Sequence, residues 1–150
     1  MSQEKPRLYI VRTVKGVPSM VVDTRLVLKD GKVVPVQAYM SKINKVYVQY
    51  QIDVSGLDKD IIFNISGKKA KFVAPSEKEC SGQYMVGDWG LIVIVSFENV
   101  HVCDIPKYAV ISIEDREFCG RFNMIEGYEV EYRICLPEGI NPDDVLYAEQ

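Results

Sequence analysis

The stretch KVYVQYQIDV, residues 45–54, shows the pattern that decides the fold. Every second residue is apolar, and the residues between them are polar or carry a polar tip. The apolar set is Val46, Val48, Tyr50, Ile52 and Val54. Because successive side chains of a strand point to opposite faces, this alternation predicts a β-strand with one buried face and one solvent-facing face.

Other segments rich in Val, Ile, Tyr and Phe recur on both sides of this stretch and predict further strands. They are residues 7–14, 19–28, 32–40, 91–97, 107–114, 117–125 and 128–136, with shorter ones at 61–66 and 71–74. Helical turns are expected only at 58–61 and at 142–146, where Asn141 and Pro142 form an N-terminal signal. We therefore predict one all-β domain over residues 1–150, an antiparallel β-sandwich or partly open barrel with at most short helical turns.

The first hairpin has a register that the sequence decides. A two-residue Asp30-Gly31 loop would place Leu26 opposite Pro35, whereas a three-residue loop of residues 29–31 places Leu26 opposite Val34. The longer loop keeps the apolar side chains on one face and puts Gly31 where a left-handed residue is needed. We expect this register, with a free side or a bulge at Pro35 because proline cannot donate to a ladder.

A second hairpin is expected from the stretch EFCGRFNMIEGYEVEYRICL, residues 117–136, turning at residues 125–127. This loop pairs Phe122 with Val130 and Phe118 with Ile134 on the buried side. On the other side it sets Arg121 against Glu131, a favourable cross-strand pair. Cys119 then lies opposite Arg133 and only diagonal to Cys135.

Four cysteines, Cys80, Cys103, Cys119 and Cys135, are each more than a dozen residues apart. Zinc sites usually pair ligands two to four residues apart, so no metal is predicted. We expect all four to be reduced small hydrophobic residues, as in an intracellular protein.

The composition is that of an ordinary globular chain, with 47% hydrophobic and 26% charged residues. The net charge of -3 gives no overall attraction to nucleic acids or anionic membranes. The longest apolar run, residues 90–97, is far shorter than the roughly 20 residues of a membrane-spanning helix. With no secretory signal pattern at the start of the sequence, we expect an intracellular protein without membrane partners.

No catalytic motif is visible. His101 is the only histidine, and a base two residues from Cys103 on one strand diverges from that nucleophile rather than meeting it. Glu129 and Glu131 fall on the solvent-facing side of a strand, and no phosphate-binding glycine motif occurs. The sequence therefore predicts a protein that is not an enzyme and needs no cofactor.

A basic cluster, SGKKAKF at residues 66–72, is the basis of an alternative reading. Lysines beside an exposed aromatic residue are typical of oligonucleotide-binding barrels. The candidate residues are Tyr47, Lys68, Lys69 and Lys71. Lysines that protect a strand edge are the commoner meaning of such a cluster. The polar segment 75–88 is expected to be a loop.

Two segments resemble the small heat-shock protein (α-crystallin) domain: IDVSGLDKDIIFNISGKKAKFVA at residues 52–74 and YRICLPEGINPDDVLYAE at residues 132–149. The resemblance implies an immunoglobulin-like sandwich that assembles through strand edges and binds unfolding clients without catalysis. It also implies two interaction sites. They are Ser55, Gly56, Leu57 and Asp58, and Leu136, Pro137, Glu138 and Gly139.

Three functions follow from these observations. The first is a non-catalytic binding or assembly module, with or without holdase chaperone activity, whose edge strands and exposed tyrosines meet other protein subunits, most simply copies of itself. The second is a structural subunit of a larger particle or filament, in which residues 75–88 order on assembly. The third is the nucleic-acid-binding barrel.

Overall fold

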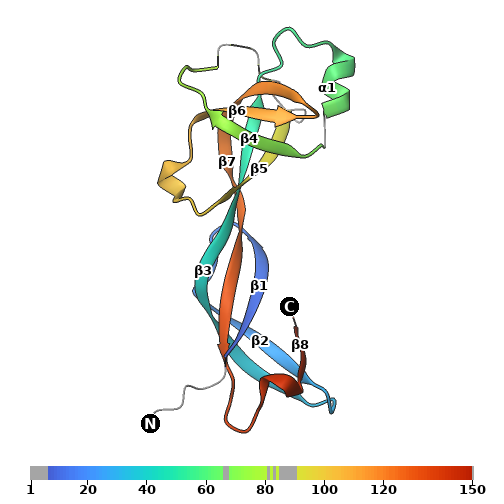
Figure 1. Ribbon diagram of the computed structural model, residues 1–150, viewed down its shortest axis with the longest axis vertical. Helices are drawn as coiled ribbons and strands as arrows, with labels where there is room; N and C mark the ends of the chain where they lie inside the picture. Colours follow the sequence, from blue (N-terminus) through green and yellow to red (C-terminus); the bar gives the residue numbers. More distant parts are fainter. Residues whose placement is uncertain (1–6, 66–67, 81, 83, 85–90, 150) are drawn as a thin grey trace. The chain divides into compact units, whose positions relative to one another are not determined.

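The computed structural model describes residues 7–65, 68–80, 82, 84 and 91–149. The chain divides into two compact units. Unit 1 comprises Met1–Asn44 and Tyr128–Gln150, and unit 2 comprises Lys45–Gly127. Each unit is described by itself, and the prediction of a single domain stays a prediction. The fold class is confirmed, because the structure is mostly antiparallel β-sheet (Figure 1).

The division falls within two long strands, β3 (Val33–Ile52) and β7 (Arg116–Cys135), which are 20 residues each. Each of these strands pairs with different strands in different parts of its length. β3 pairs with β2 at residues 33–39 and with β5 at residues 45–51, whereas β7 pairs with β6 at residues 116–121. The two predicted strands 32–40 and 45–54 are therefore parts of one strand.

Unit 1 contains β1 (Arg7–Lys15), β2 (Val21–Leu28) and β8 (Val145–Glu149) besides its parts of β3 and β7. β8 pairs with β2, β2 with β3, β3 with β7, and β7 with β1. Six residues form the buried core. They are Leu26, Ala38, Val130, Tyr132, Ile134 and Leu136. The Tyr132 hydroxyl donates to the Ser19 carbonyl at 2.9 Å, which satisfies the polar tip of a fully buried ring.

The predicted register of the first hairpin is confirmed. Leu26 lies opposite Val34 and Val22 opposite Ala38, and Gly31 has a φ of 90°. The Leu28 N–H donates to the Lys32 carbonyl at 2.8 Å, which closes the three-residue loop. Pro35 lies opposite Arg25 with no register shift between these strands, so there is no bulge at the proline in this pairing.

Unit 2 contains α1 (Lys59–Ile65), β4 (Ala70–Pro75), β5 (Ile92–Glu98), the short 3-10 helix η1 (Val102–Asp104) and β6 (Tyr108–Ile113). Its strand order is β5-β3-β7-β6-β4. The two edge strands also contact each other, and the rings of Phe72 on β4 and Phe97 on β5 have centroids 5.0 Å apart. The sheet therefore curls into a partly open barrel.

The interior of this barrel is apolar and includes the hydroxyl of Tyr50. Val46, Val48 and Ile52 of β3 are buried, which confirms the alternation predicted for this strand. Tyr50 is also fully buried, and its hydroxyl donates to the Pro106 carbonyl at 2.7 Å. Burial raises the pKa of Tyr50 to about 12, because the ionised phenolate would lose its hydration.

Gly120 allows close packing inside the barrel. A Cβ atom at this position would lie 2.5 Å from the Ile111 Cδ1 atom and 3.3 Å from the Tyr50 Cβ atom. We expect Gly120→Ala to lower the free energy of unfolding by about 1–3 kcal/mol, because Ile111 is fully buried and has little room to move. Chemical denaturation measures this loss.

The double variant Gly120→Ala/Ile111→Val supplies the control for this prediction. Valine lacks the Cδ1 atom that the new methyl group meets, so the double variant should lose less stability than the sum of the two single variants. Strict additivity would show that the methyl group meets something other than Ile111.

The predicted second hairpin is wrong, because residues 116–135 form the single strand β7. Glu126 and Gly127 lie within the strand and make no turn. The predicted pairs across that turn, including Phe122 with Val130 and Arg121 with Glu131, therefore do not form. Arg121 instead lies opposite Tyr108 of β6, its guanidinium donates to the Gln51 side-chain oxygen at 2.5 Å, and it lies 4.1 Å from the Tyr84 ring centroid.

The expectation of four reduced cysteines is also wrong. Cys80 and Cys119 form a disulfide that ties the segment after β4 to β7. Cys103 and Cys135 are free, as expected, but both are exposed. The predicted opposition of Cys119 to Arg133 is lost with the hairpin, since Cys119 lies opposite Val110 of β6.

The predicted strand at residues 61–66 is a helix over its described part. Asp58 caps α1, because its Oδ1 atom accepts the Ile61 N–H at 2.9 Å, and Asp60 lies in the first turn. Ile65 is buried whereas Phe63 is 81% exposed, so one face of the helix packs and the opposite face is solvent-exposed. The β-branched residues here follow helical spacing.

Two further local predictions need correction. The predicted helical turn at 142–146 is shorter, because the 3-10 helix η2 (Pro142–Asp144) is followed directly by β8. The loop expected over residues 75–88 begins later, since Pro75 belongs to β4. The rest of that loop is described only at residues 76–80, 82 and 84.

Candidate interaction surface

Strands β8, β2 and β3 lie side by side in unit 1 (Figure 1). Their register places apolar and charged residues in regular rows on the side away from the core. We call this the unit 1 face. It consists of Val21, Asp23, Arg25 and Val27 on β2, Val33, Pro35, Gln37 and Tyr39 on β3, and Tyr147 and Glu149 on β8. These residues share one side because each is separated from the next on its strand by two positions.

Apolar residues occupy both ends of the unit 1 face. At one end Val27 lies opposite both Tyr147 and Val33, and at the other end Val21 lies opposite Tyr39. Tyr147 is 52% exposed, Val33 49%, Val21 44% and Tyr39 41%. Large apolar side chains exposed in register on neighbouring strands are typical of surfaces that contact another molecule.

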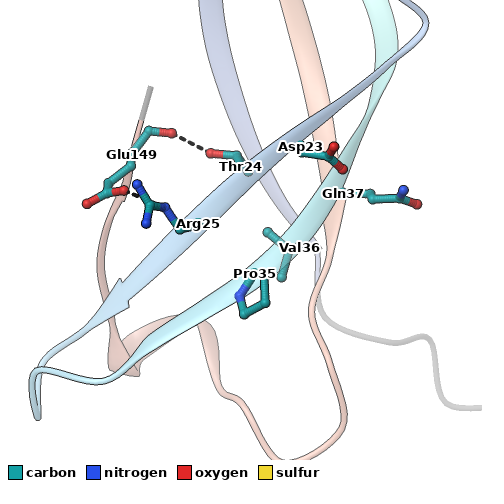
Figure 2. A pocket seen from close by; sticks show the side chains of 7 residues that line it. All are labelled: Asp23, Thr24, Arg25, Pro35, Val36, Gln37 and Glu149. Carbon is teal, nitrogen blue, oxygen red and sulfur yellow. Dashed lines mark hydrogen bonds and ion pairs between the residues drawn. The ribbon is translucent and has the colours of Figure 1, made fainter.

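Charged and polar residues occupy the middle of the unit 1 face. Arg25 lies opposite both Glu149 and Pro35, and Asp23 lies opposite Gln37. Figure 2 shows Arg25 beside Glu149, where the Arg25 Nε atom is 2.9 Å from the Glu149 Oε2 atom. The Arg25 side chain is 65% exposed, so this ion pair contributes at most about 1 kcal/mol to stability.

A depression of about 500 Å³ lies at these middle rows. Its lining includes Asp23, Arg25, Pro35 and Gln37, together with Thr24 and Glu149 (Figure 2). The depression lies at the centre of the face, between the two rows of bulky apolar side chains at its ends. It contains opposite charges at its rim rather than one sign of charge.

A hydrogen-bond network beneath the face fixes the end of β8. The Thr24 hydroxyl donates to the Glu149 carbonyl oxygen (Figure 2). The Arg12 Nη2 atom on β1 donates to the Thr24 hydroxyl and to the Glu149 carbonyl, each at 2.9 Å. Arg12 thereby links β1 to β2 and β8, three strands of the same unit.

The predicted interaction residues at 55–58 make local structure in unit 2. The Ser55 N–H donates to the Asp53 Oδ1 atom at 2.9 Å, and Gly56 has a φ of 74°, so these residues form the turn after β3. Leu57 is half-buried, and Asp58 is the cap of α1. The role of these residues in binding stays a prediction.

The other predicted interaction residues belong to unit 1. Leu136 is only 3% exposed and packs in the core, so its side chain is not accessible to a partner. Pro137, Glu138 and Gly139 are exposed, and the Ile140 N–H donates to the Pro137 carbonyl at 3.2 Å to close a turn. The two predicted interaction segments are therefore in different units.

The candidate nucleic-acid residues lie on separate elements of unit 2. Tyr47 is half-buried on β3 opposite Ser96 of β5, and Lys71 is exposed on β4 opposite Ser112 of β6. Lys68 and Lys69 are exposed and precede β4. Lys68 lines a depression of about 330 Å³ together with Arg116, but Glu114 lines it too and reduces its positive charge.

The described residues that were considered for catalysis are not assembled into a site. His101 is exposed at the start of η1, so the strand expected around it is absent, and Cys103 is likewise exposed. Among residues 7–65, 68–80, 82, 84 and 91–149, no group of three or more His, Cys, Asp or Glu side chains is placed to hold a metal ion. No helix in the same part of the chain is long and apolar enough to cross a membrane.

The unit 1 face was not predicted from the sequence, although the sequence contains the evidence for its β2 and β3 residues. The correct register of β2 and β3 already places Val21, Asp23 and Arg25 on the side away from the core. The contribution of Glu149 was hidden, because β8 was not predicted. Comparisons of the chain with models of protein families, with curated proteins and with solved structures find no match.

Proposed function

We propose that this protein is a non-catalytic assembly module whose unit 1 face contacts another protein subunit. The observation that carries the proposal is the exposure of apolar residues at both ends of the face. Val33 and Tyr147 flank the half-buried Val27 at one end, and Val21 lies opposite Tyr39 at the other. Tyrosine is enriched at protein interfaces, because its ring supplies a large apolar area at a low entropic cost.

The distribution of exposed tyrosines supports the same proposal. Of the described residues, Tyr9, Tyr39 and Tyr147 are the tyrosines that are more than two-fifths exposed, and all three belong to unit 1. In unit 2 the large exposed apolar residues include Phe63, which is alone on the outer side of α1. Unit 1 is therefore the better candidate for a binding surface.

The test is the solution mass of the full chain, measured by light scattering from micromolar to submillimolar concentration. We expect a mass that rises with concentration in the wild-type protein. Tyr39→Asp should shift it towards the monomer, because a charge would be buried against an apolar partner. Phe63→Asp is the matched control, since it places the same charge on an exposed apolar residue of unit 2 and should leave the mass unchanged. A wild-type protein that is monomeric throughout would overturn assembly with itself.

A further inference from the structure

We infer that the partner of the unit 1 face is a second copy of the same chain, related by a two-fold axis that runs across the strands through the row of Thr24 and Val36. The inference rests on the proposed function and names its partner and its geometry. The observation that carries it is a symmetry in the chemistry of β2 and β3.

The outward residues of β2 are self-complementary about Thr24. Val21 and Val27 are each three positions from Thr24, and Asp23 and Arg25 are each one position from it. A two-fold axis perpendicular to the strand reverses the strand direction in the second copy. Val21 of one copy then faces Val27 of the other, and Asp23 faces Arg25.

The outward residues of β3 follow the same rule about Val36. Val36 lies directly opposite Thr24 in the register, so one axis serves both strands. The axis sets Tyr39 of one copy against Val33 of the other, and Gln37 against Pro35. The apolar residues at the ends of β2 and β3 therefore meet apolar residues, while Asp23 and Arg25 of β2 each meet the opposite charge.

Such an arrangement satisfies the requirements of a two-fold interface. The same patch must serve both copies, so that residue i contacts residue j and j contacts i. Two sheets pack face to face at about 10 Å with their strands nearly aligned, which leaves room for one layer of interleaved side chains from each copy. The depression at the middle rows lies on the proposed axis, where the Asp23 and Arg25 side chains of both copies would enter.

The existing charge contacts are compatible with this pairing. Arg25 contacts Glu149 through its Nε atom. A guanidinium group carries five N–H donors, so Arg25 has the capacity to bind a second carboxylate such as Asp23 of the second copy. Asp23 is exposed, and none of the ion pairs found among the described residues includes it. The pair of Asp23 and Arg25 therefore gives the interface both its register and its specificity.

The test uses the two single charge reversals, Asp23→Arg and Arg25→Asp, in the full chain. Each variant alone would place like charges opposite one another twice in a homodimer. We expect the dimer dissociation constant of each variant, measured by light scattering, to rise at least about 100-fold over that of the wild type. Lys59→Glu, a charge reversal of the same size at an exposed residue on α1 of unit 2, is the control and should leave the constant unchanged.

Mixing the two variants gives the decisive result. An Asp23→Arg chain carries two arginines on β2 and an Arg25→Asp chain carries two aspartates, so a heterodimer contains only opposite charges at the axis. We expect an equimolar mixture to regain the dimer mass, with the 1:1 composition shown by native mass spectrometry. Recovery also shows that both variants are folded, which circular dichroism checks separately.

Three results would overturn the inference. If the wild type assembles but neither reversal weakens the dimer, Asp23 and Arg25 do not meet at a two-fold axis, and Tyr39→Asp then decides whether the unit 1 face is the contact surface. If both variants are folded monomers and their mixture stays monomeric, Asp23 and Arg25 do not face each other. If the wild type is monomeric, the protein does not assemble with itself, and a second copy is not the partner of the unit 1 face.

Discussion

Replacing Cys119 with serine is expected to lower the free energy of unfolding by about 4 kcal/mol. The disulfide joins residues with a sequence separation of 39, and closing a loop of that length removes about this much conformational freedom from the unfolded chain. Cys80 is only 8% exposed, so its unpaired thiol would also lose a packed neighbour. Unfolding in urea, followed by circular dichroism, measures the loss, and treating the wild type with dithiothreitol should reproduce it.

Cys135→Ser is the matched control for this prediction. Cys135 lies on the same strand but is free and exposed, so the substitution should change the free energy of unfolding by less than about 0.5 kcal/mol. Alkylation of the unfolded, unreduced protein should modify Cys103 and Cys135 and spare Cys80 and Cys119. Equal stability of the two serine variants, or labelling of all four cysteines, would contradict the disulfide.

The β2–β3 hairpin could be predicted from the sequence because its evidence is local. Turn residues, apolar alternation and the position of Pro35 lie within about twenty residues, and a slip of one position would move every apolar side chain to the wrong face. Gly31 then has to adopt the left-handed conformation that the structure shows. The same register places Asp23 and Arg25 on the side of β2 that faces away from the core.

The single strand β7 could not be predicted, because a glycine within a strand and a glycine in a turn look alike in a sequence. Gly127 is buried in β7 rather than exposed at a hairpin tip. The choice between the two depends on partners far along the chain, such as β6 for residues 116–121. A turn at residues 125–127 fits the sequence only as long as the strands that pair with β7 are not known.

The candidate surface and the disulfide were missed for related reasons. Pro142 and two acids signal a helix start, but η2 ends at Asp144 and Val145 begins a strand that is held by β2. Cysteine connectivity is not encoded by spacing, so the bond between Cys80 and Cys119 becomes visible only when the segment after β4 is placed on β7. In each case the deciding contact is between residues that are distant in the chain.

Tyr132→Ala is expected to lower the free energy of unfolding by about 3–5 kcal/mol, the range for removing a buried aromatic ring. Tyr132 is fully buried among Leu26, Ala38, Val130 and Ile134, so alanine would leave a cavity between strands that cannot close together. Its hydroxyl bond to the Ser19 carbonyl would be lost as well. The measurement is urea unfolding of the purified variant.

Two control variants separate the causes of this loss. Tyr132→Phe keeps the ring and removes only the hydroxyl, so it should cost about 1 kcal/mol, the typical net value of one hydrogen bond. Tyr9→Ala removes a ring that is 53% exposed on β1, and it should cost less than about 0.5 kcal/mol. If Tyr132→Ala cost no more than Tyr9→Ala, the ring would not be packed in the core of unit 1. The side chains of Val130, Tyr132 and Ile134 would then point away from the core of unit 1. The unit 1 face would in that case lie on the core side of the sheet instead of the outer side.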